Sequence, residues 1–161
     1  AINQLKRTQG EGTGTSTDGL GFVAACRHIG IEPDGSVLRM RGGGSAARSI
    51  AAAWADAGGL LIPEQGRRTL VGGPWDGAVV ADGRADLGID LDAAPAGGHS
   101  DPLDADTQVS ISYGDGADTD EFAVVMVAAQ HLEAWKSIFA PERAAELPSL
   151  SLLLERISVT P

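Results

Sequence analysis

A glycine-rich turn at residues 42–47, with the sequence GGGSAA, constrains this chain more than any other stretch. It has the form G-x-G-x-x-A and lies between the short apolar run VLRM at residues 37–40 and a helical pattern over residues 45–57. Such a turn presents backbone N–H groups and the positive end of a helix, which suits the pyrophosphate of a dinucleotide. Gly42 permits the tight turn, Gly44 lets the backbone approach the phosphates, and Ala47 keeps the helix close to the strand. Tight packing of a helix on a sheet also uses small residues, so packing alone remains the alternative.

Short apolar runs alternate with amphipathic helical patterns along the 161 residues. This alternation predicts a single α/β domain with a Rossmann-like, doubly wound, mostly parallel sheet. Strands are predicted at residues 1–7, 36–41, 60–62, 78–81, 86–90 and 108–113, and helices at residues 17–28, 45–57, 120–139 and 149–157. A turn rich in Gly and Thr is predicted at residues 10–14.

Two arginines conflict with this prediction, because Arg39 and Arg41 lie in the strand expected at the centre of the sheet. Buried unpaired guanidinium groups would be costly. We therefore expect them to reach solvent or acidic partners at the strand edge, or the strand to be less buried than usual. Pro63 and Gly66 are expected to end the next strand early.

The charge balance excludes one class of partner. With 12 Lys and Arg against 22 Asp and Glu, the formal net charge of −10 repels nucleic acid.

The single cysteine, Cys26, lies in a helical pattern, which favours a small buried residue and a reducing cytoplasm. No apolar run approaches the roughly 18 residues of a membrane span, so we expect a cytoplasmic protein that does not bind membranes.

A second motif, STDG at residues 16–19, opens the first predicted helix. Thr17 or Ser16 is expected to cap that helix, and Asp18 would lie in its first turn, where a negative charge is favourable. From these residues alone, Asp18 reads as a first-turn charge rather than a catalytic group.

Several segments, in order and spacing, resemble the shikimate and quinate dehydrogenase family. The matches run from residue 1 to about residue 139; they are AINQL at 1–5, STDGLGF at 16–22, GGGSAAR at 42–48, DAAPAGG at 92–98 (similar to the family's N-A-T-P-x-G-M loop), SYG at 112–114 and MVAAQ at 126–130. The resemblance implies NADP-dependent interconversion of shikimate or quinate and its 3-dehydro form. It also implies that Asp18 helps to remove or return the hydroxyl proton. Asn3, Tyr113 and Gln130 would bind the ring hydroxy acid.

The resemblance places the cofactor on the glycine turn and on a basic segment. Its implied cofactor-binding residues are Gly42, Gly43, Gly44, Ser45, Ala46, Arg67, Arg68 and Thr69, of which the last three are similar to the family's N-R-T. Arginine can grip a 2′-phosphate with paired charge-assisted hydrogen bonds, which favours NADP. Glu64, about twenty residues after the glycines, would instead bind the ribose hydroxyls of NAD. An ordinary solvated arginine pair is the remaining alternative.

The family carries an N-terminal substrate domain with a catalytic lysine before the point that matches residue 1. We therefore expect either a part of a longer enzyme or a reduced protein, with residues 1–17 and 126–161 facing that domain. The stretch 66–86 is shorter than in the family, which favours a trimmed fold with a reduced helix and strand. Two alternatives are a non-catalytic nucleotide-binding or regulatory module derived from the enzyme, and a purely structural α/β domain.

No metal site is expected. The acidic residues at 101–106 and 115–121 lack the spacing of a calcium loop. His28, His99 and His131 show no metal-ligand spacing and are expected at the surface. The expected ligands are therefore a cofactor and a small ring hydroxy acid, and formation of a homodimer is left open.

Overall fold

The computed structural model describes residues 2–92, 101–111 and 121–158, and its centre is a four-stranded parallel sheet. The strands are β3 (Val37–Arg41), β4 (Leu60–Glu64), β5 (Leu87–Asp90) and β6 (Thr107–Val109), in the order β4-β3-β5-β6. All three strand pairs are parallel. The predicted α/β class and the parallel sheet are therefore confirmed.

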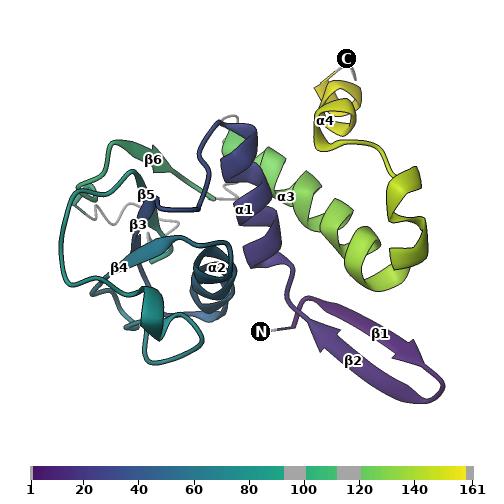
Figure 1. Cartoon of the computed structure of the whole chain (residues 1–161), viewed down its shortest axis with the longest axis horizontal. Helices are drawn as coiled ribbons and strands as arrows, with labels where there is room; N and C mark the ends of the chain where they lie inside the picture. The colour runs from purple at the N-terminus through teal and green to yellow at the C-terminus, as the bar shows by residue number, and fades with distance from the viewer. Residues whose placement is uncertain (1, 93–100, 112–120, 159–161) are drawn as a thin grey trace.

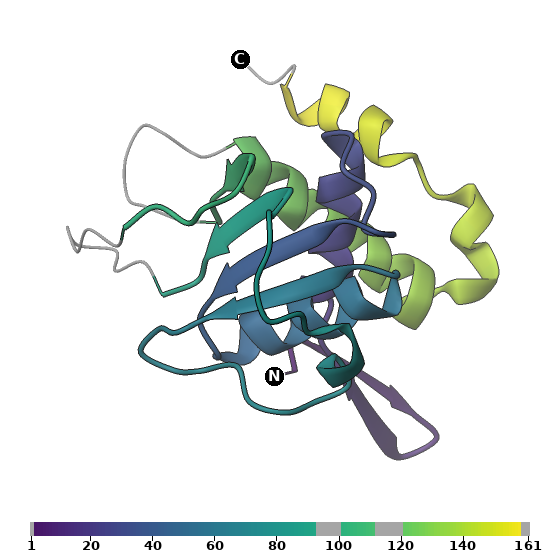
Figure 2. The same ribbon diagram turned by 60° about the vertical axis from the view of Figure 1, so that its left-hand side comes forward.

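Three helices pack on one face of this sheet (Figure 2). They are α1 (Asp18–His28), α2 (Ser45–Asp56) and α3 (Glu121–Ala134). After α3 come a π-helical turn, η2 (Trp135–Phe139), a 3-10 helix, η3 (Pro141–Glu146), and α4 (Leu150–Ser158), which packs against α3. The helices predicted from the apolar periodicity are all present, with α3 ending earlier than expected because its last residues form the π turn.

The N-terminal segment is a hairpin that projects away from the sheet (Figure 1). Its strands β1 (Gln4–Thr8) and β2 (Glu11–Thr15) are antiparallel. The turn predicted at residues 10–14 is therefore wrong. The chain reverses at Gln9 and Gly10, whose φ angles of 52° and 90° suit a two-residue hairpin turn, and the Gly/Thr run then continues as a strand.

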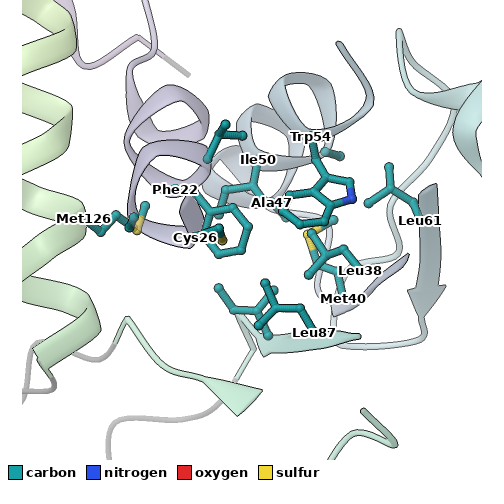
Figure 3. Packing of buried hydrophobic residues seen from close by; sticks show 14 of the residues in the cluster. Phe22, Cys26, Leu38, Met40, Ala47, Ile50, Trp54, Leu61, Leu87 and Met126 are labelled. Carbon is teal, nitrogen blue, oxygen red and sulfur yellow. The ribbon is translucent and has the colours of Figure 1, made fainter. Parts of the chain in front are cut away.

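The helices bury the apolar face of the sheet. Leu38 lies opposite both Leu61 and Leu87 in register, so these side chains point to one face. Phe22 of α1 fills the centre of this core (Figure 3), with its ring centroid 6.0 Å from that of Trp54 and 5.7 Å from that of Phe122. Cys26 of α1 is also buried in this core, which confirms the prediction of a small buried helix residue. This burial raises the pKa of its thiol to about 12.

The opposite face of the sheet carries ion pairs and loops. Arg39 is only 8% exposed, and its guanidinium donates to Glu64 at 2.5 Å and to the Gly83 carbonyl at 2.8 Å. Arg41 donates to Asp90 at 2.7 Å. Of the expected alternatives, acidic partners are the one observed for both arginines, and they lie on the strands that flank β3.

Loops take the place of the second helical layer of a doubly wound sheet in the part of the chain that the structure describes. Leu103 and Ala105 lie over Gly88, where a Cβ atom would come within 3.1 Å of Ala105 Cβ. The strand predicted at residues 78–81 is reduced to an isolated parallel bridge between Leu61 and Val79. The only regular helix within residues 66–86 is the 3-10 turn η1 (Asp76–Ala78), as expected for a trimmed fold.

The predicted early end of the strand at Pro63 is wrong, because β4 continues to Glu64. The Leu61 carbonyl accepts a hydrogen bond from the Val80 N–H, so the backbone groups of Leu61 point to the edge of β4 that faces away from β3. The backbone nitrogen of Pro63, two residues on, points to the same edge, and its missing N–H therefore removes no hydrogen bond to β3.

We predict that Glu64→Ala lowers the free energy of unfolding by about 1–3 kcal/mol, because it leaves the buried Arg39 guanidinium without its main partner. Asp82→Ala is the control, since Asp82 lies 3.5 Å from Arg39 but its side chain is 89% exposed. Urea denaturation monitored by tryptophan fluorescence measures both. Equal losses in the two variants would contradict this account of the ion pair.

Candidate functional site

The glycine turn joins β3 to α2 in the form predicted. Gly42 has a φ of +115°, which a side chain rarely allows. A Cβ atom on Gly43 would overlap the Thr69 carbonyl, so this glycine lets the segment after β4 pack against the turn. A Cβ atom on Gly44 would meet no atom of the described residues within 4 Å, so the backbone there is open toward them.

The N-terminus of α2 provides backbone donors at this turn. Gly44 is the N-cap residue, none of the described side chains caps the helix, and its first turn holds no acidic residue. The first N–H groups of a helix have no partner within it, and the helix dipole favours an anion there. The turn can therefore hold a phosphate group through its backbone.

A cavity of about 490 Å³ opens beside this helix end. Its lining combines the start of α2 with two segments that follow β4 and β5; it consists of Gly44, Ser45, Ala46, Ala47, Arg67, Arg68, Leu91 and Asp92. Arg67 and Arg68 are both exposed. Thr69 is exposed but does not line the cavity, and its carbonyl instead packs on Gly43.

Glu64, the alternative ligand for ribose hydroxyls, does not line this cavity. Its carboxylate accepts the hydrogen bond from Arg39 on the loop-covered face of the sheet. That bond also raises the pKa of the Arg39 guanidinium. The acid is therefore held by a structural partner, while the two arginines are at the cavity.

A second group of polar side chains forms around Asp18, the first residue of α1. Asn3 Nδ2 donates to Asp18 Oδ1 at 2.6 Å, and Gln130 Nε2 of α3 donates to the same oxygen at 3.3 Å. The Ser16 hydroxyl is 3.3 Å from Asp18 Oδ2. Three side chains that the sequence placed far apart, Asn3, Asp18 and Gln130, thus meet at one carboxylate.

The expected capping of α1 by its own Thr17 or Ser16 is wrong. Thr17 is fully buried, and its backbone N–H donates to Asn3 Oδ1 at 2.9 Å. The donor near the helix start, Gly19 N–H, instead binds the hydroxyl of Ser49 on α2 at 3.0 Å. Sequence reasoning missed Ser49, because only the packing of α1 on α2 brings it to that helix end.

Two glycines of α1 bring the three helices together. A Cβ atom on Gly19 would overlap the Ser49 carbonyl of α2, and a Cβ atom on Gly21 would overlap the Gln130 side chain of α3. At Gly21 it would also come within 2.9 Å of the Met126 carbonyl. The glycines of the TDGLG segment therefore set the helix spacing that brings Gln130 to Asp18.

The remaining predicted site residues are placed as follows. Tyr113 and residues 93–98 of the loop similar to N-A-T-P-x-G-M lie outside the described residues. His28 and His131 are exposed, as predicted, and His99 lies outside the described residues.

Among residues 2–92, 101–111 and 121–158, no three His, Cys, Asp or Glu side chains gather as metal ligands. No helix in the described part of the chain has the length and apolar character to cross a membrane.

Several curated proteins have similar sequences. A shikimate dehydrogenase (NADP(+)) of Acidiphilium cryptum is 33% identical over 116 residues, which are 66% of this chain and 42% of that protein. Proteins with the same name from Rubrobacter xylanophilus and Syntrophomonas wolfei are 49% identical over 45 residues and 47% identical over 58 residues. These two matches cover 28% and 36% of this chain. The matched segments span 16–42% of the three relatives, and no family model matches the chain.

Solved structures share the fold. Shikimate dehydrogenase 1 from Peptoclostridium difficile superposes with a TM-score of 0.60 at 14% identity, covering 99% of this chain and 67% of that one. A chorismate mutase/shikimate 5-dehydrogenase fusion protein from Clostridium acetobutylicum gives 0.55 at 18% identity, with 98% and 68% covered. The 5-ketofructose reductase of a Gluconobacter strain also gives 0.55 at 18% identity, with 84% and 62% covered.

We predict that Gly21→Ala lowers the free energy of unfolding by about 1–3 kcal/mol, because the methyl group forces α1 and α3 apart at Gln130. Gly77→Ala is the control, since a Cβ atom on the exposed Gly77 meets nothing within 4 Å. Thermal unfolding followed by circular dichroism compares the two. A Gly21→Ala protein as stable as Gly77→Ala would show that this helix spacing does not depend on glycine.

Proposed function

Because the chain belongs to the shikimate dehydrogenase family, we propose that it forms the cofactor-binding part of an NADP-dependent enzyme that interconverts a ring hydroxyl and a ketone. The substrate is shikimate or quinate, or its 3-dehydro form. The observation that carries the proposal is the meeting of Asn3 and Gln130 at Asp18, three residues that the family resemblance assigns to the substrate.

The cofactor fits the cavity beside α2. The open backbone at Gly44 and the uncapped helix end suit a pyrophosphate, with Gly42, Gly43, Ser45 and Ala46 completing the turn. Arg67 and Arg68 suit a 2′-phosphate, and the pairing of Glu64 with Arg39 supports NADP over NAD. When bound, the nicotinamide supplies the hydride acceptor.

In this proposal, Asp18 helps to remove the proton of the substrate hydroxyl or to return it. Two amide donors, from Asn3 and Gln130, bind its Oδ1, while Oδ2 has one partner among the described residues, the Ser16 hydroxyl at 3.3 Å. Oδ2 is therefore the oxygen that can accept a hydrogen bond from a substrate hydroxyl and take up its proton. Tyr113 is the further ring-binding residue in this proposal.

Exposed apolar side chains support the proposal that residues 1–17 and 126–161 contact a partner domain. Six of the ten large hydrophobic side chains exposed in the described residues lie in these two segments; they are Ile2, Leu5, Trp135, Phe139, Leu152 and Ile157. Lys6 Nζ donates to the Ile138 carbonyl at 2.6 Å and ties the hairpin to the π turn after α3. Exposed apolar side chains of this kind mark interaction surfaces, and we assign these two segments to contacts with the substrate domain.

A second candidate function is a non-catalytic nucleotide-binding or regulatory module. It is favoured by the protein partners that occupy both oxygens of Asp18. In that case the cavity beside α2 still binds the nucleotide, and Asp18 serves to hold α1, α3 and the segment before β1 together.

We predict that the chain binds NADP⁺ about ten- to a hundredfold more tightly than NAD⁺, the range expected for charge-assisted hydrogen bonds. Replacing both Arg67 and Arg68 with Ala should erase this preference and leave NAD⁺ binding intact, whereas Gly44→Trp should abolish both by filling the open backbone site. Isothermal titration calorimetry measures the affinities, with the exposed Arg84→Ala as control. Equal affinities in the unmodified chain would contradict the arginine assignment, and absence of binding to folded protein would exclude the dehydrogenase.

We predict negligible shikimate oxidation by the 161 residues alone, and activity in a parent chain that also supplies the family's lysine-bearing substrate domain. In that parent, Asp18→Asn should lower kcat/KM by about 10²–10⁴, the usual contribution of a general acid or base. Formation of NADPH measures both, with the exposed Asp56→Asn as control. An Asp18→Asn parent with full activity would contradict the catalytic role of Asp18, and an unmodified parent without activity would favour the non-catalytic candidate.

A further inference from the structure

Asp92 is an acidic residue inside a cavity that otherwise suits anions. It follows β5 by two residues, lines the cavity with Gly44 and Arg68, and its side chain is only 13% exposed. A Cβ atom on Gly42 would come within 3.3 Å of Asp92 Oδ1, and one on Gly66 would overlap Oδ2. The carboxylate therefore lies between the glycine turn and the segment that carries both arginines.

The contacts of Asp92 hold the backbone of Arg67 but not its guanidinium. Oδ2 accepts a hydrogen bond from the Arg67 backbone N–H. The Arg67 Nη2 atom is 3.9 Å from Oδ1, too far for a hydrogen bond, and the Arg67 side chain is 73% exposed. The backbone is thus fixed, while the guanidinium is free to turn toward a ligand.

The Asp92 backbone is itself anchored in the ion pairs of the sheet. Its N–H donates to Asp90 Oδ1 at 2.9 Å, and Asp90 Oδ2 accepts from Arg41 at 2.7 Å. The Asp92 backbone is therefore fixed to β5 and β3, and its carboxylate is held at the cavity by the bond to the Arg67 backbone. A bound phosphate would share the cavity with this negative charge.

We propose that Asp92 sets the phosphate preference of the cavity, by repelling phosphate and by competing with it for the Arg67 guanidinium. This inference rests on the proposed cofactor binding at the same cavity. Asp92 is a positioning residue in this account, because it acts on the ligand through charge and through Arg67. Removal of its charge should strengthen NADP⁺ binding more than NAD⁺ binding, since the 2′-phosphate adds negative charge that NAD⁺ lacks.

Asp92→Asn separates charge from structure, because the amide oxygen can still accept the Arg67 N–H. We expect Asp92→Asn to tighten NADP⁺ about three- to tenfold and NAD⁺ by less, with a smaller gain at high salt. In an Arg67→Ala background the gain should shrink, because there is no guanidinium left to compete for. Asp106→Asn is the matched control, since it removes the same charge from the exposed pair with Arg84 beside the amino end of β6.

Calorimetric titration with NADP⁺, NAD⁺ and inorganic pyrophosphate measures these affinities. If the unmodified protein binds neither nicotinamide cofactor, the proposed function is contradicted. The role of Asp92 can still be tested with pyrophosphate, because tighter pyrophosphate binding by Asp92→Asn than by the unmodified protein supports the inference. A ratio of NADP⁺ to NAD⁺ affinity that is unchanged or lower in Asp92→Asn would overturn it. Pyrophosphate binding that Asp92→Asn leaves unchanged, weakens or fails to produce would overturn it as well.

Discussion

The close approach of α1 to both α2 and α3 is the constraint on which the rest of the structure depends. Gly19 and Gly21 carry no side chain, so the backbone of α1 can contact Ser49 on one side and Gln130 on the other. The same packing brings the Ser49 hydroxyl to the start of α1 and the Gln130 amide to Asp18. Phe22, one residue on, then fills the core between Trp54 and Phe122.

The two faces of the sheet are stabilised by different interactions. The helix-covered face is apolar and supplies stability through burial of Leu38, Leu61 and Leu87. The other face is held by the pairs that Arg39 and Arg41 make with acidic neighbours, under loops instead of helices. The acidic partners are Glu64 and Asp90, and Asp90 also binds the backbone of Asp92, so one of these ion pairs leads to the cavity beside α2.

Local patterns predicted most of the fold, because apolar periodicity and glycine turns depend on nearby residues. The helices, the parallel strands and the turn at residues 42–47 follow from such patterns. The partners of Arg39, the role of Ser49 and the position of Asp92 did not follow, because each depends on contacts between residues far apart in the chain. Gln9 and Gly10 carried a hairpin signal that the run of Gly and Thr after them obscured. The meeting of Asn3 and Gln130 at Asp18 was reachable only through the family resemblance, and their roles stay predictions.

The central claim is that a dinucleotide lies along the glycine turn with its 2′-phosphate at the two arginines. A crystal structure of the chain with NADP⁺ tests this most directly. We expect the pyrophosphate on the backbone of residues 42–47 and the 2′-phosphate within hydrogen-bond distance of Arg67 or Arg68. A larger groove of about 870 Å³ also lies beside α2, is lined in part by Ser49, Asp56 and Pro74, and is the alternative place where a cofactor could be found. A cofactor in that groove, or a 2′-phosphate away from both arginines, would contradict the account.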